Sequence, residues 1–425
     1  MAETSSYCRE LVNTSLLAGQ IMISAGAETH RVEDMITRML KTTGYEQADA
    51  FVLPTGITVT LADGKDDICS VTRRVSPGTN NLSRICSVNT VSRDFCSGKI
   101  TLEQAKARLE EIKTEHIYAV PLKILGTMIA CGAFTVLFGG SLLEGLAATI
   151  CGIFVALINY GARKIIGRDF ICDALCALVL TIITLLLTHF TAKWGIMTLR
   201  PQYIIVGSIM PLVPGVAITN AIRDILQGDY LSSCARIIEA FMIAASVAIG
   251  VGAGIFFGGH VSLLTEEFGF ALENSRRGII GYAFGIASAA ISTIGFSTIF
   301  EVPKKYIFTV AVVSGFGWVT YLTAVYAGIS VDWSSFLAAS VIELLSYALA
   351  RIQKAPITLF LICGILPLVP GAGIYRAAYS VIFADSSEAL LDTLTIAGAI
   401  ALAIIVMDTF LNILNKLYKK TRKKA

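Results

Sequence analysis

The feature that most constrains this chain is a series of long apolar runs that occupies almost everything after residue 118. The runs have 17 to 25 residues, and about 20 helical residues are enough to cross the ~30 Å hydrocarbon core of a bilayer. The mean hydropathy of +0.70 is far above that of an average soluble domain. The sequence therefore predicts a polytopic α-helical membrane protein with about ten transmembrane helices. We expect these helices near residues 121–138, 142–160, 172–190, 201–219, 235–257, 279–299, 306–327, 333–350, 355–376 and 389–414.

The distribution of charge divides the chain into a soluble part and a membrane part. Residues 1–118 have a much higher density of charged side chains than the remainder, and we expect them to form a small cytoplasmic α+β domain. The first apolar stretch, 11–27, is interrupted by polar residues and lacks a basic segment before it, so it does not resemble a secretory signal. The membrane part is predicted to contain one half at 119–258, a second half at 279–415 and a basic cytoplasmic tail at 416–425.

Within the predicted soluble domain the pattern changes from helical to strand-like and back. Apolar residues recur at helical spacing over 11–25, and a second helix is expected next, with Thr29 as its N-cap and Glu33 and Asp34 in its first turn. Short β-prone runs separated by turn residues then predict an antiparallel sheet. These runs are 51–53, 57–61 and 68–72, with a turn at 63–64. Helices are expected again near 82–95 and after a capping-box spacing at 101–104.

The Lys and Arg residues of the short loops indicate which side of the membrane each loop faces, because cytoplasmic loops are enriched in them. With the N-terminus inside, the inner segments hold fifteen Lys and Arg residues and the outer loops hold four. This asymmetry predicts that the N- and C-termini are both cytoplasmic. The pair Arg276–Arg277 in the longest outer loop is an exception to the rule.

The string PLVPG occurs twice, at Pro211–Gly215 and at Pro367–Gly371, with an offset of 156 residues. Similar residues flank both copies at the same offset, as Ile209 and Ile365 do. Each copy lies in the fourth of five predicted spans, and because five is odd, the second half must be inverted relative to the first. We therefore predict two inverted five-helix repeats, which is an architecture of secondary transporters.

Each PLVPG motif should interrupt its helix near the middle of the bilayer, because two prolines remove backbone donors and the glycine permits unusual dihedral angles. Such backbone is tolerated in a membrane where it packs inside the protein or lines a wet cavity, and matching broken helices point to a substrate site. The alternative is that both are merely kinked packing helices. The predicted substrate-binding residues are Pro211, Pro214, Gly215, Asn220, Pro367, Pro370, Gly371, Tyr375 and Arg376.

Two carboxylates inside the predicted spans are candidates for coupling transport to an ion. Glu343 lies midway along its span and Glu239 lies within another. A buried carboxylate is costly in a membrane, so each could bind a proton or a cation, and Glu343 could also pair with the ammonium group of a substrate. Glu239 could instead simply pair with Arg236 one turn away.

Charged residues that follow the two motifs are candidates for a gate or for a substrate contact. Arg223 and Asp224 follow the first motif and form a candidate inner gate, although they could be no more than a charged cytoplasmic loop. Tyr375 and Arg376 follow the second motif, where they could bind a carboxylate or only anchor the outer interface.

Other functional classes lack their sequence signatures here. The ten cysteines form no Cys-x-x-Cys pair and the four histidines are scattered, so we expect neither disulfides nor a metal site. The sequence contains no P-loop motif that could couple transport to ATP hydrolysis. The basic run at 416–424 is a topology anchor rather than a nucleic-acid patch. We therefore predict no cofactor and no nucleic-acid partner.

A hydrolase and a channel are the two further alternatives. Glu28, His30, Arg31 and Glu33 cluster at a helix start, but no nucleophile, general base and orienting group accompany them. A regulatory or gating domain is therefore preferred to an enzyme. A passive channel would need a continuous polar lining, and the predicted spans show few polar faces.

On these residues the chain resembles the threonine/serine exporter family, in the form that fuses a soluble domain with two membrane halves. The residues that carry the likeness are Ser24–Glu28 with Arg31–Glu33, Pro211–Gly215 with Asn220, Ala221 and Asp224, and Pro367–Gly371 with Tyr375. The resemblance implies proton-driven export of threonine and serine across a bacterial inner membrane. Dicarboxylates such as succinate are a substrate class of members whose halves are separate proteins, so a dicarboxylate exporter is the alternative. Glycine-rich spans also leave a homo-oligomer open.

Overall fold

The computed structural model of the protein divides into two compact units. Unit 1 comprises residues 1–118, 224–236 and 300–304, and unit 2 comprises 119–223, 237–299 and 305–425. Two short segments from far along the chain therefore belong to the same unit as the N-terminal residues. The structure describes residues 2–45, 47–62, 68–76, 78, 80–163, 169–260, 279–369, 371, 373 and 388–422.

The helices of unit 1 are α1 (Ala2–Ser24), α2 (Thr29–Leu40), the 3-10 helix η1 (Lys41–Thr43), α3 (Leu82–Cys96) and α4 (Leu102–Thr114). Two of them, α3 and α4, begin at side-chain caps. The predicted capping box is confirmed, because the side chains of Thr101 and Gln104 bond to each other's backbone N–H groups. The predicted start of α2 is wrong. Glu28, not Thr29, is the N-cap, its side chain makes no capping bond, and the first turn therefore contains no acidic residue.

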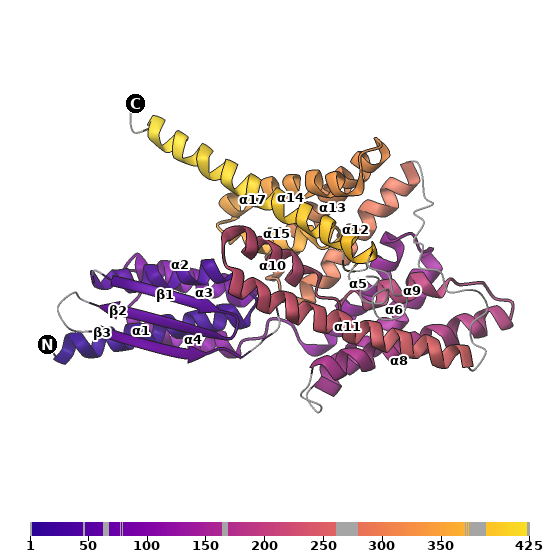
Figure 1. Cartoon of the computed structure of the whole chain (residues 1–425), viewed down its shortest axis with the longest axis horizontal. Helices are drawn as coiled ribbons and strands as arrows, with labels where there is room; N and C mark the ends of the chain where they lie inside the picture. Colours follow the sequence, from indigo (N-terminus) through magenta and orange to yellow (C-terminus); the bar gives the residue numbers. More distant parts are fainter. Residues whose placement is uncertain are drawn as a thin grey trace. The chain divides into compact units, whose positions relative to one another are not determined.

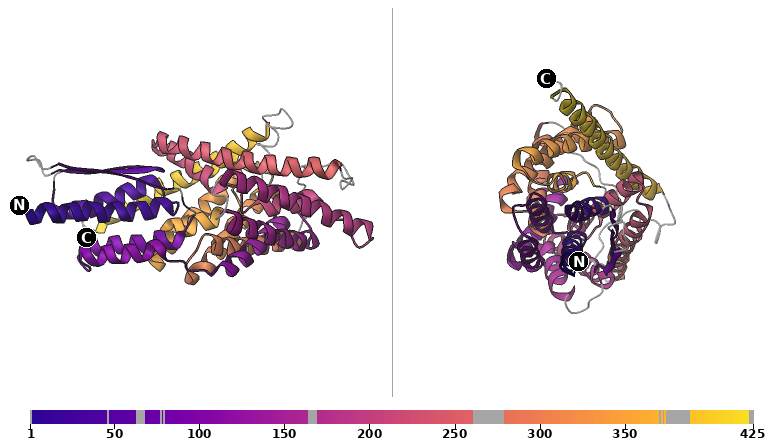
Figure 2. Two further views of the ribbon diagram at one scale, coloured as in Figure 1. Left: turned by 90° about the horizontal axis from the view of Figure 1, so that it is seen from below. Right: turned by 90° about the vertical axis from the view of Figure 1, so that its left-hand side faces the viewer.

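The sheet of unit 1 has three antiparallel strands in the order β1-β2-β3. They are β1 (Gln47–Leu53), β2 (Gly56–Ala62) and β3 (Ile68–Arg74), so the predicted runs are strands, while the turn at 63–64 lies outside the described residues. On β2 the side chains of Ile57, Val59 and Leu61 are fully buried and those between them are partly exposed. Figure 2 (left) shows the sheet edge-on with the helices of this unit along one of its faces.

Unit 2 is built from helices, which Figure 1 labels. They are α5 (Val120–Leu137), α6 (Leu142–Leu157) with the π-helical turn η2 (Ile158–Ala162), α8 (Asp169–Lys193), α9 (Pro201–Ile209), α10 (Gly215–Gln227), α11 (Tyr230–His260), α12 (Ile279–Ile299), the 3-10 helix η3 (Lys304–Tyr306), α13 (Ile307–Tyr326), α14 (Val331–Gln353), α15 (Ile357–Ile365) and α17 (Glu388–Arg422). The end of α10 and the start of α11 belong to unit 1.

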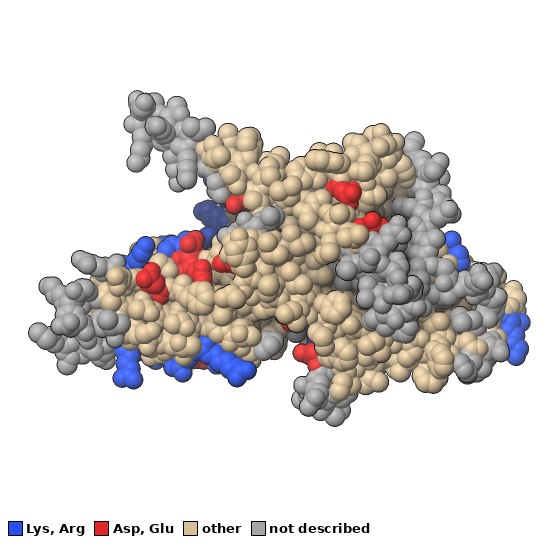
Figure 3. Space-filling view, viewed as in Figure 1, with Lys and Arg blue, Asp and Glu red and all other residues tan. Residues whose placement is uncertain are grey.

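Eight helices in the described part of the chain are long and apolar enough to cross a membrane. The two other predicted spans, 201–219 and 355–376, contain the PLVPG motifs and begin as the short helices α9 and α15. Unit 2 also exposes large apolar side chains, among them Phe256, Phe308 and Phe316, as helices that face lipid do. Figure 3 shows that charged side chains are sparse on the visible face of these helices.

Small residues bring the helices of unit 2 close together. A Cβ atom on Gly126 of α5 would collide with Thr298 of α12, and one on Gly295 of α12 would lie 2.6 Å from the carbonyl oxygen of Gly126. In the first half, Gly250 and Gly254 of α11 lie in the same way against α8. These glycines allow the close backbone approach by which helices associate in membranes, and their packing here is within one chain.

An ion pair with a buried carboxylate joins the starts of α6 and α9. Both oxygens of Glu144 accept hydrogen bonds from the guanidinium of Arg200, at 3.0 and 3.1 Å, and the Arg200 backbone N–H adds a bond of 2.9 Å. The side chain of Glu144 is 3% exposed. The Arg200 side chain is 43% exposed, but because the pair is bidentate, it fixes the position at which the first broken helix begins.

Candidate functional site

Both motifs interrupt their helices with the same backbone hydrogen bonds. Helix α9 ends at Ile209 and α15 ends at Ile365. The N–H of Leu212 bonds to the carbonyl of Ile209 at 2.8 Å, and the N–H of Leu368 bonds to the carbonyl of Ile365 at 2.8 Å. In each motif the next N–H reaches the same carbonyl, at 3.2 and 3.0 Å. Two segments 156 residues apart therefore share one local conformation.

The prolines explain why the helices stop at this place. Pro211 and Pro214 have no N–H, so the carbonyl groups one turn before them lose their helical partners. The chain tightens instead, and the carbonyl of Met210 accepts from Val213 at 3.4 Å, within the same turn. The chain resumes as a helix at Gly215. In the second motif Pro367 is buried, while Pro370 lies outside the described residues.

The two motifs pack directly against each other. A Cβ atom on Gly215 would collide with Cγ1 of Val369 and would lie 3.7 Å from the Cα atom of Gly371. A Cβ atom on Gly371 would lie 3.1 Å from Cε of Met210 and 3.6 Å from Cγ1 of Val213. Each glycine thus gives the other motif room, and the break points of both halves of unit 2 meet. We call these five residues the motif crossing.

Buried polar side chains follow the first motif on α10. Thr219 is fully buried and its hydroxyl donates to the carbonyl of Gly215 at 3.2 Å. The neighbouring Asn220, one of the predicted site residues, is 6% exposed. Tyr375 and Arg376, which occupy the equivalent positions after the second motif, lie outside the described residues.

Helix α5 packs against the last turn of α9 before the first motif. The thiol of Cys131 donates to the carbonyl oxygen of Ser208 at 3.6 Å, and a Cβ atom on Gly207 would collide with the side chain of Thr135. The contacts of Cys131 and Thr135 with α9 could not be predicted, since neither residue lies near a motif in the sequence. Their only signal is that small and weakly polar residues favour helix contacts in membranes.

The two coupling candidates differ in their surroundings. Glu343 is 1% exposed on α14, and its neighbour Ile342 contacts Gly364 of α15, three residues before the second motif. Glu239 is exposed on α11. The alternative role of Glu239, an ion pair with Arg236, is not supported, because the Arg236 guanidinium lies 3.4 Å from Asp224 instead.

Asp224, a predicted gate residue, lies in a buried ionic cluster of unit 1. Its carboxylate is 1% exposed and lies 3.4 Å from Nε of Arg236, whose guanidinium also donates to the carbonyl of Ala27 at 3.0 Å. Close by in the chain, Asp229 accepts a hydrogen bond of 3.3 Å from the hydroxyl of Thr29. The segment 224–236 is therefore bonded to the turn between α1 and α2. The side chain of Arg223 is not among those described.

The α1–α2 region carries further charged groups. Glu28 is 2% exposed and pairs with Arg31 at 2.9 Å, and Glu33 accepts from the backbone N–H of Val52 at 2.9 Å. Burial raises the pKa of Glu33, and the negative charge of Asp229 raises it further, against the opposite effect of the Val52 bond. These contacts pair the charged side chains of the α1–α2 region with partners inside unit 1.

Residues 300–304 form the other distant segment of unit 1. The N–H of Leu82 donates to the carbonyl of Phe300 at 2.8 Å. Glu301 has a φ of 50°, which is uncommon for a residue with a side chain, and its carboxylate accepts from the N–H of Ile117 at 3.2 Å and contacts His116 at 3.0 Å. The hydroxyl of Tyr118 donates to the carbonyl of Val302 at 2.7 Å. These bonds hold residues 116–118, the last residues of unit 1 before α5, against the segment 300–304.

The long apolar helices and the two interrupted ones define a multi-pass helical membrane protein. Within the described residues no group of three or more His, Cys, Asp or Glu side chains could hold a metal ion. The chain belongs to the threonine/serine exporter family. The family model with that description matches residues 13–258, and a second model of the same description matches residues 285–410.

Curated relatives cover most of the chain at low identity. The chain is 24% identical over 400 residues to a protein of Corynebacterium glutamicum named threonine/serine exporter, covering 92% of this chain and 79% of the relative. It is 22% identical over 422 residues to a protein of Mycobacterium tuberculosis (strain ATCC 25618 / H37Rv) named probable threonine/serine exporter, covering 95% and 77%. No solved structure matches.

Proposed function

We propose that this protein is a secondary transporter that exports threonine and serine across the bacterial inner membrane, driven by the proton gradient. The substrate passes the middle of the membrane at the motif crossing. The observation that carries this proposal is that the two break points, far apart in the sequence, contact each other through Gly215 and Gly371. Family membership and the names of the relatives supply the substrate class.

The motif crossing is suited to binding a small zwitterion transiently. Interrupted helices expose backbone N–H and carbonyl groups that bind carboxylate and ammonium groups, respectively. Thr219 and Asn220 add buried polar side chains beside the first motif. Because Gly215 packs against Val369 and Gly371 packs against Met210, a substrate can pass this point only if the two helices separate.

The arrangement of the chain supports an inverted repeat. The short helices α9 and α15 have nine residues each and begin 156 residues apart, and each is the fourth span of its half. Three parts of the chain belong to unit 1, namely residue 118 and the segments 224–236 and 300–304. All three lie on the side of the membrane that loop charge predicts to be cytoplasmic. A second half inverted relative to the first satisfies this order.

We assign the Asp224–Arg236 pair to an inner gate. Asp224 lies near the end of α10, the helix that starts at the motif crossing, and it is paired inside unit 1. A movement of α10 that opens the motif crossing must therefore break this pair or carry unit 1 with it. The N-terminal residues thus act as the regulatory part of the transporter.

Efflux from proteoliposomes tests the proposal. Vesicles are preloaded with labelled threonine, serine or succinate, and release is followed with and without an imposed pH gradient. We expect gradient-stimulated release of threonine and serine. Release of succinate alone would assign the protein to dicarboxylate export. Release that stops when the substrate concentrations inside and outside the vesicles are equal, with or without the pH gradient, would indicate a passive pore.

Two proline variants connect the activity with the motif crossing. Pro214→Ala restores a backbone donor at the break, and we expect it to reduce efflux more than it reduces membrane insertion. Pro201→Ala is the matched control, because Pro201 is at the first position of α9, where a helix needs no donor. Equal efflux in both variants would remove the motif crossing from the mechanism.

A further inference from the structure

The turn between α12 and α13, residues 300–304, is held from two sides within unit 1. On one side is the start of α3, where the N–H of Leu82 donates to the carbonyl oxygen of Phe300 at 2.8 Å. The N–H of Ser83 donates in the same way to the carbonyl oxygen of Glu301 at 3.1 Å. The first turn of a helix leaves such N–H groups without a helical partner. The backbone of the turn 300–304 therefore completes the N-terminus of α3.

The side chain of Glu301 holds the turn from the other side. It is 5% exposed. One carboxylate oxygen accepts from the backbone N–H of Ile117 at 3.2 Å, and the other lies 3.0 Å from Nδ1 of His116. Glu301 has a φ of 50°, which costs free energy in a residue with a Cβ atom and persists only where surrounding contacts maintain it. The bonds to Ile117 and His116 are contacts of this kind.

His116 makes one of these bonds sensitive to pH. Its side chain is 62% exposed, so it can exchange protons with the surrounding solution. A histidine ordinarily changes its charge between about pH 5 and pH 8. The protonated ring donates a stronger, charge-assisted hydrogen bond to a carboxylate than the neutral ring does. Lowering the pH through this range should therefore strengthen the bond to Glu301.

Histidine is the only residue type in the segments that meet here that ordinarily titrates near neutral pH. The other ionisable residues of these segments, besides Glu301, are Arg84, Glu115, Tyr118 and Lys304. The Arg84 guanidinium donates to the carbonyl oxygen of Glu115 at 3.2 Å. Burial raises the pKa of Tyr118, and the charge of Glu301 raises it further. The Tyr118 hydroxyl therefore stays protonated and keeps its bond to the turn.

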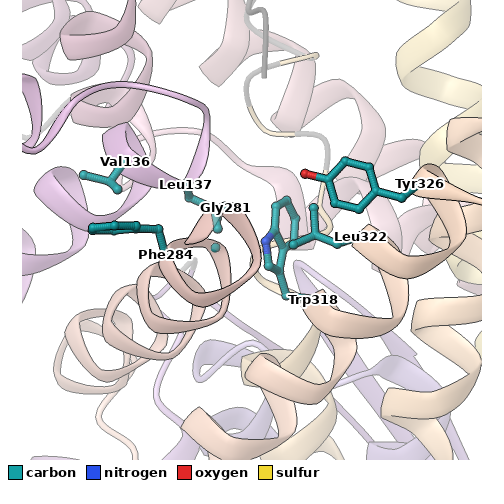
Figure 4. A pocket seen from close by; sticks show the side chains of 8 residues that line it. Val136, Leu137, Gly281, Phe284, Trp318, Leu322 and Tyr326 are labelled. Carbon is teal, nitrogen blue, oxygen red and sulfur yellow. The ribbon is translucent and has the colours of Figure 1, made fainter. Parts of the chain in front are cut away.

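Helices α12 and α13 pack against each other, so a movement of the turn between them moves both. Nearer the turn, the hydroxyl of Thr293 on α12 donates to the hydroxyl of Ser314 on α13 at 2.7 Å. Farther from it, a Cβ atom on Gly285 of α12 would lie 2.8 Å from the indole nitrogen of Trp318 and 3.1 Å from Cδ1 of Leu322. Figure 4 shows these two side chains of α13 beside α12.

Helix α13 also contacts the broken helix of the second half. A Cβ atom on Gly364 of α15 would lie 2.8 Å from Cγ1 of Val313, which is in the second turn of α13. Gly364 is in the last turn of α15, directly before the second motif. A movement of α15 that opens the motif crossing must therefore shift α13 or break this packing. The contacts of the turn 300–304 oppose a shift of α13.

We propose that Glu301 is a positioning residue for transport and that His116 makes its effect depend on the cytoplasmic pH. With His116 protonated, the turn is held firmly, α13 keeps its place against α15, and the helices of the motif crossing separate less readily. With His116 neutral, the hold weakens. A carrier that imports protons would thereby slow as the cytoplasm becomes acidic. This inference rests on the proposed function and deepens it, since it assigns a regulation to unit 1.

Amide hydrogen exchange measures the hold on the turn without transport. The purified full-length protein is compared at about pH 6 and about pH 8, with the intrinsic pH dependence of exchange corrected for. Because His116 is largely exposed and the pair is screened by solvent, we expect the amides of Leu82 and Ser83 to be about fivefold better protected at the lower pH. His116→Gln should remove this difference, and His116→Lys should give the higher protection at both pH values.

Two further variants complete the exchange experiment. Glu115→Gln is the matched control, because Glu115 is exposed beside His116, and it should keep the pH difference of the unaltered protein. Glu301→Gln should lower protection at both pH values and remove the difference. Protection that changes with pH in His116→Gln as it does in the unaltered protein, or that changes in neither, would overturn the role of His116 and leave the exporter function intact.

Threonine efflux from proteoliposomes connects the hold with transport. The ratio of efflux by His116→Gln to efflux by the unaltered protein is measured at two internal pH values and the same pH gradient. We expect a ratio near one at about pH 8 and a clearly higher ratio at about pH 6, whereas a merely structural role of His116 would give the same ratio at both. An equal ratio would overturn the regulation. Protection that depends on His116, in a protein without any efflux, would instead overturn the proposed function.

Discussion

At the scale of single residues, the prolines and glycines of the motifs determine most of the site. Pro211 and Pro214 remove donors whatever surrounds them, which is why the break after Ile209 could be predicted from the sequence. The contact between Gly215 and Gly371 could not, because it depends on how two distant helices pack.

Glu343 is the residue for which we expect an effect on proton coupling. It is buried on α14, so Glu343→Gln removes an ionisable group while keeping its size. We expect the variant to insert normally and to lose the dependence of threonine efflux on pH, measured in proteoliposomes over a series of internal pH values. Glu239→Gln is the comparison, because Glu239 is exposed on α11, and an equal change in both variants would contradict the assignment.

Glu33 gives unit 1 a dependence on pH whose sign can be worked out. Burial raises its pKa above the ordinary value of 4.5, so the folded protein binds a proton that the unfolded chain has lost. The corresponding stability is fully present below pH 4.5 and is lost as the pH rises through the folded pKa. Thermal unfolding of the full chain should show this decrease, and Glu33→Gln should flatten it, whereas the exposed change Glu110→Gln on α4 should not.

At the scale of elements, the segment 224–236 connects a broken helix with the α1–α2 turn. The buried Asp224–Arg236 pair and the bond from Arg236 to Ala27 hold it. The sequence offered Glu239 as a possible partner of Arg236, because a helical spacing indicates only neighbours on the same helix. The observed partner precedes the helix start and is reached through the turn at Gly228 and Asp229.

Removing the guanidinium should release this segment. Arg236→Ala removes the guanidinium that lies 3.4 Å from the buried carboxylate of Asp224, and breaking a buried pair of this kind costs about 3–5 kcal/mol. We expect faster amide hydrogen exchange over 224–236 and at the α1–α2 turn. Arg31→Ala is the control, because the ion pair of Arg31 is with Glu28. Unchanged protection of 224–236 in both variants would contradict the role of the Asp224–Arg236 pair.

At the scale of the whole molecule, the length of apolar runs and the alternation of apolar residues predict the helices and strands better than their packing. Eight predicted spans correspond to long helices, and all three predicted strands are present, because length and alternation are local properties. The membership of 224–236 and 300–304 in unit 1 could not be predicted, since it rests on buried bonds such as that of Leu82 to Phe300. Such contacts leave no periodic signal.

The measurement that most directly tests the account is threonine efflux by G215A, V369A and the double variant G215A/V369A. A methyl group on Gly215 would collide with Val369, and overpacking of this kind costs about 1–3 kcal/mol. We predict that G215A reduces efflux by about tenfold or more, that V369A retains most of it, and that the double variant recovers it because the space is restored. Efflux that stays as low in the double variant as in G215A, or normal efflux in G215A, would contradict a transport route through the motif crossing.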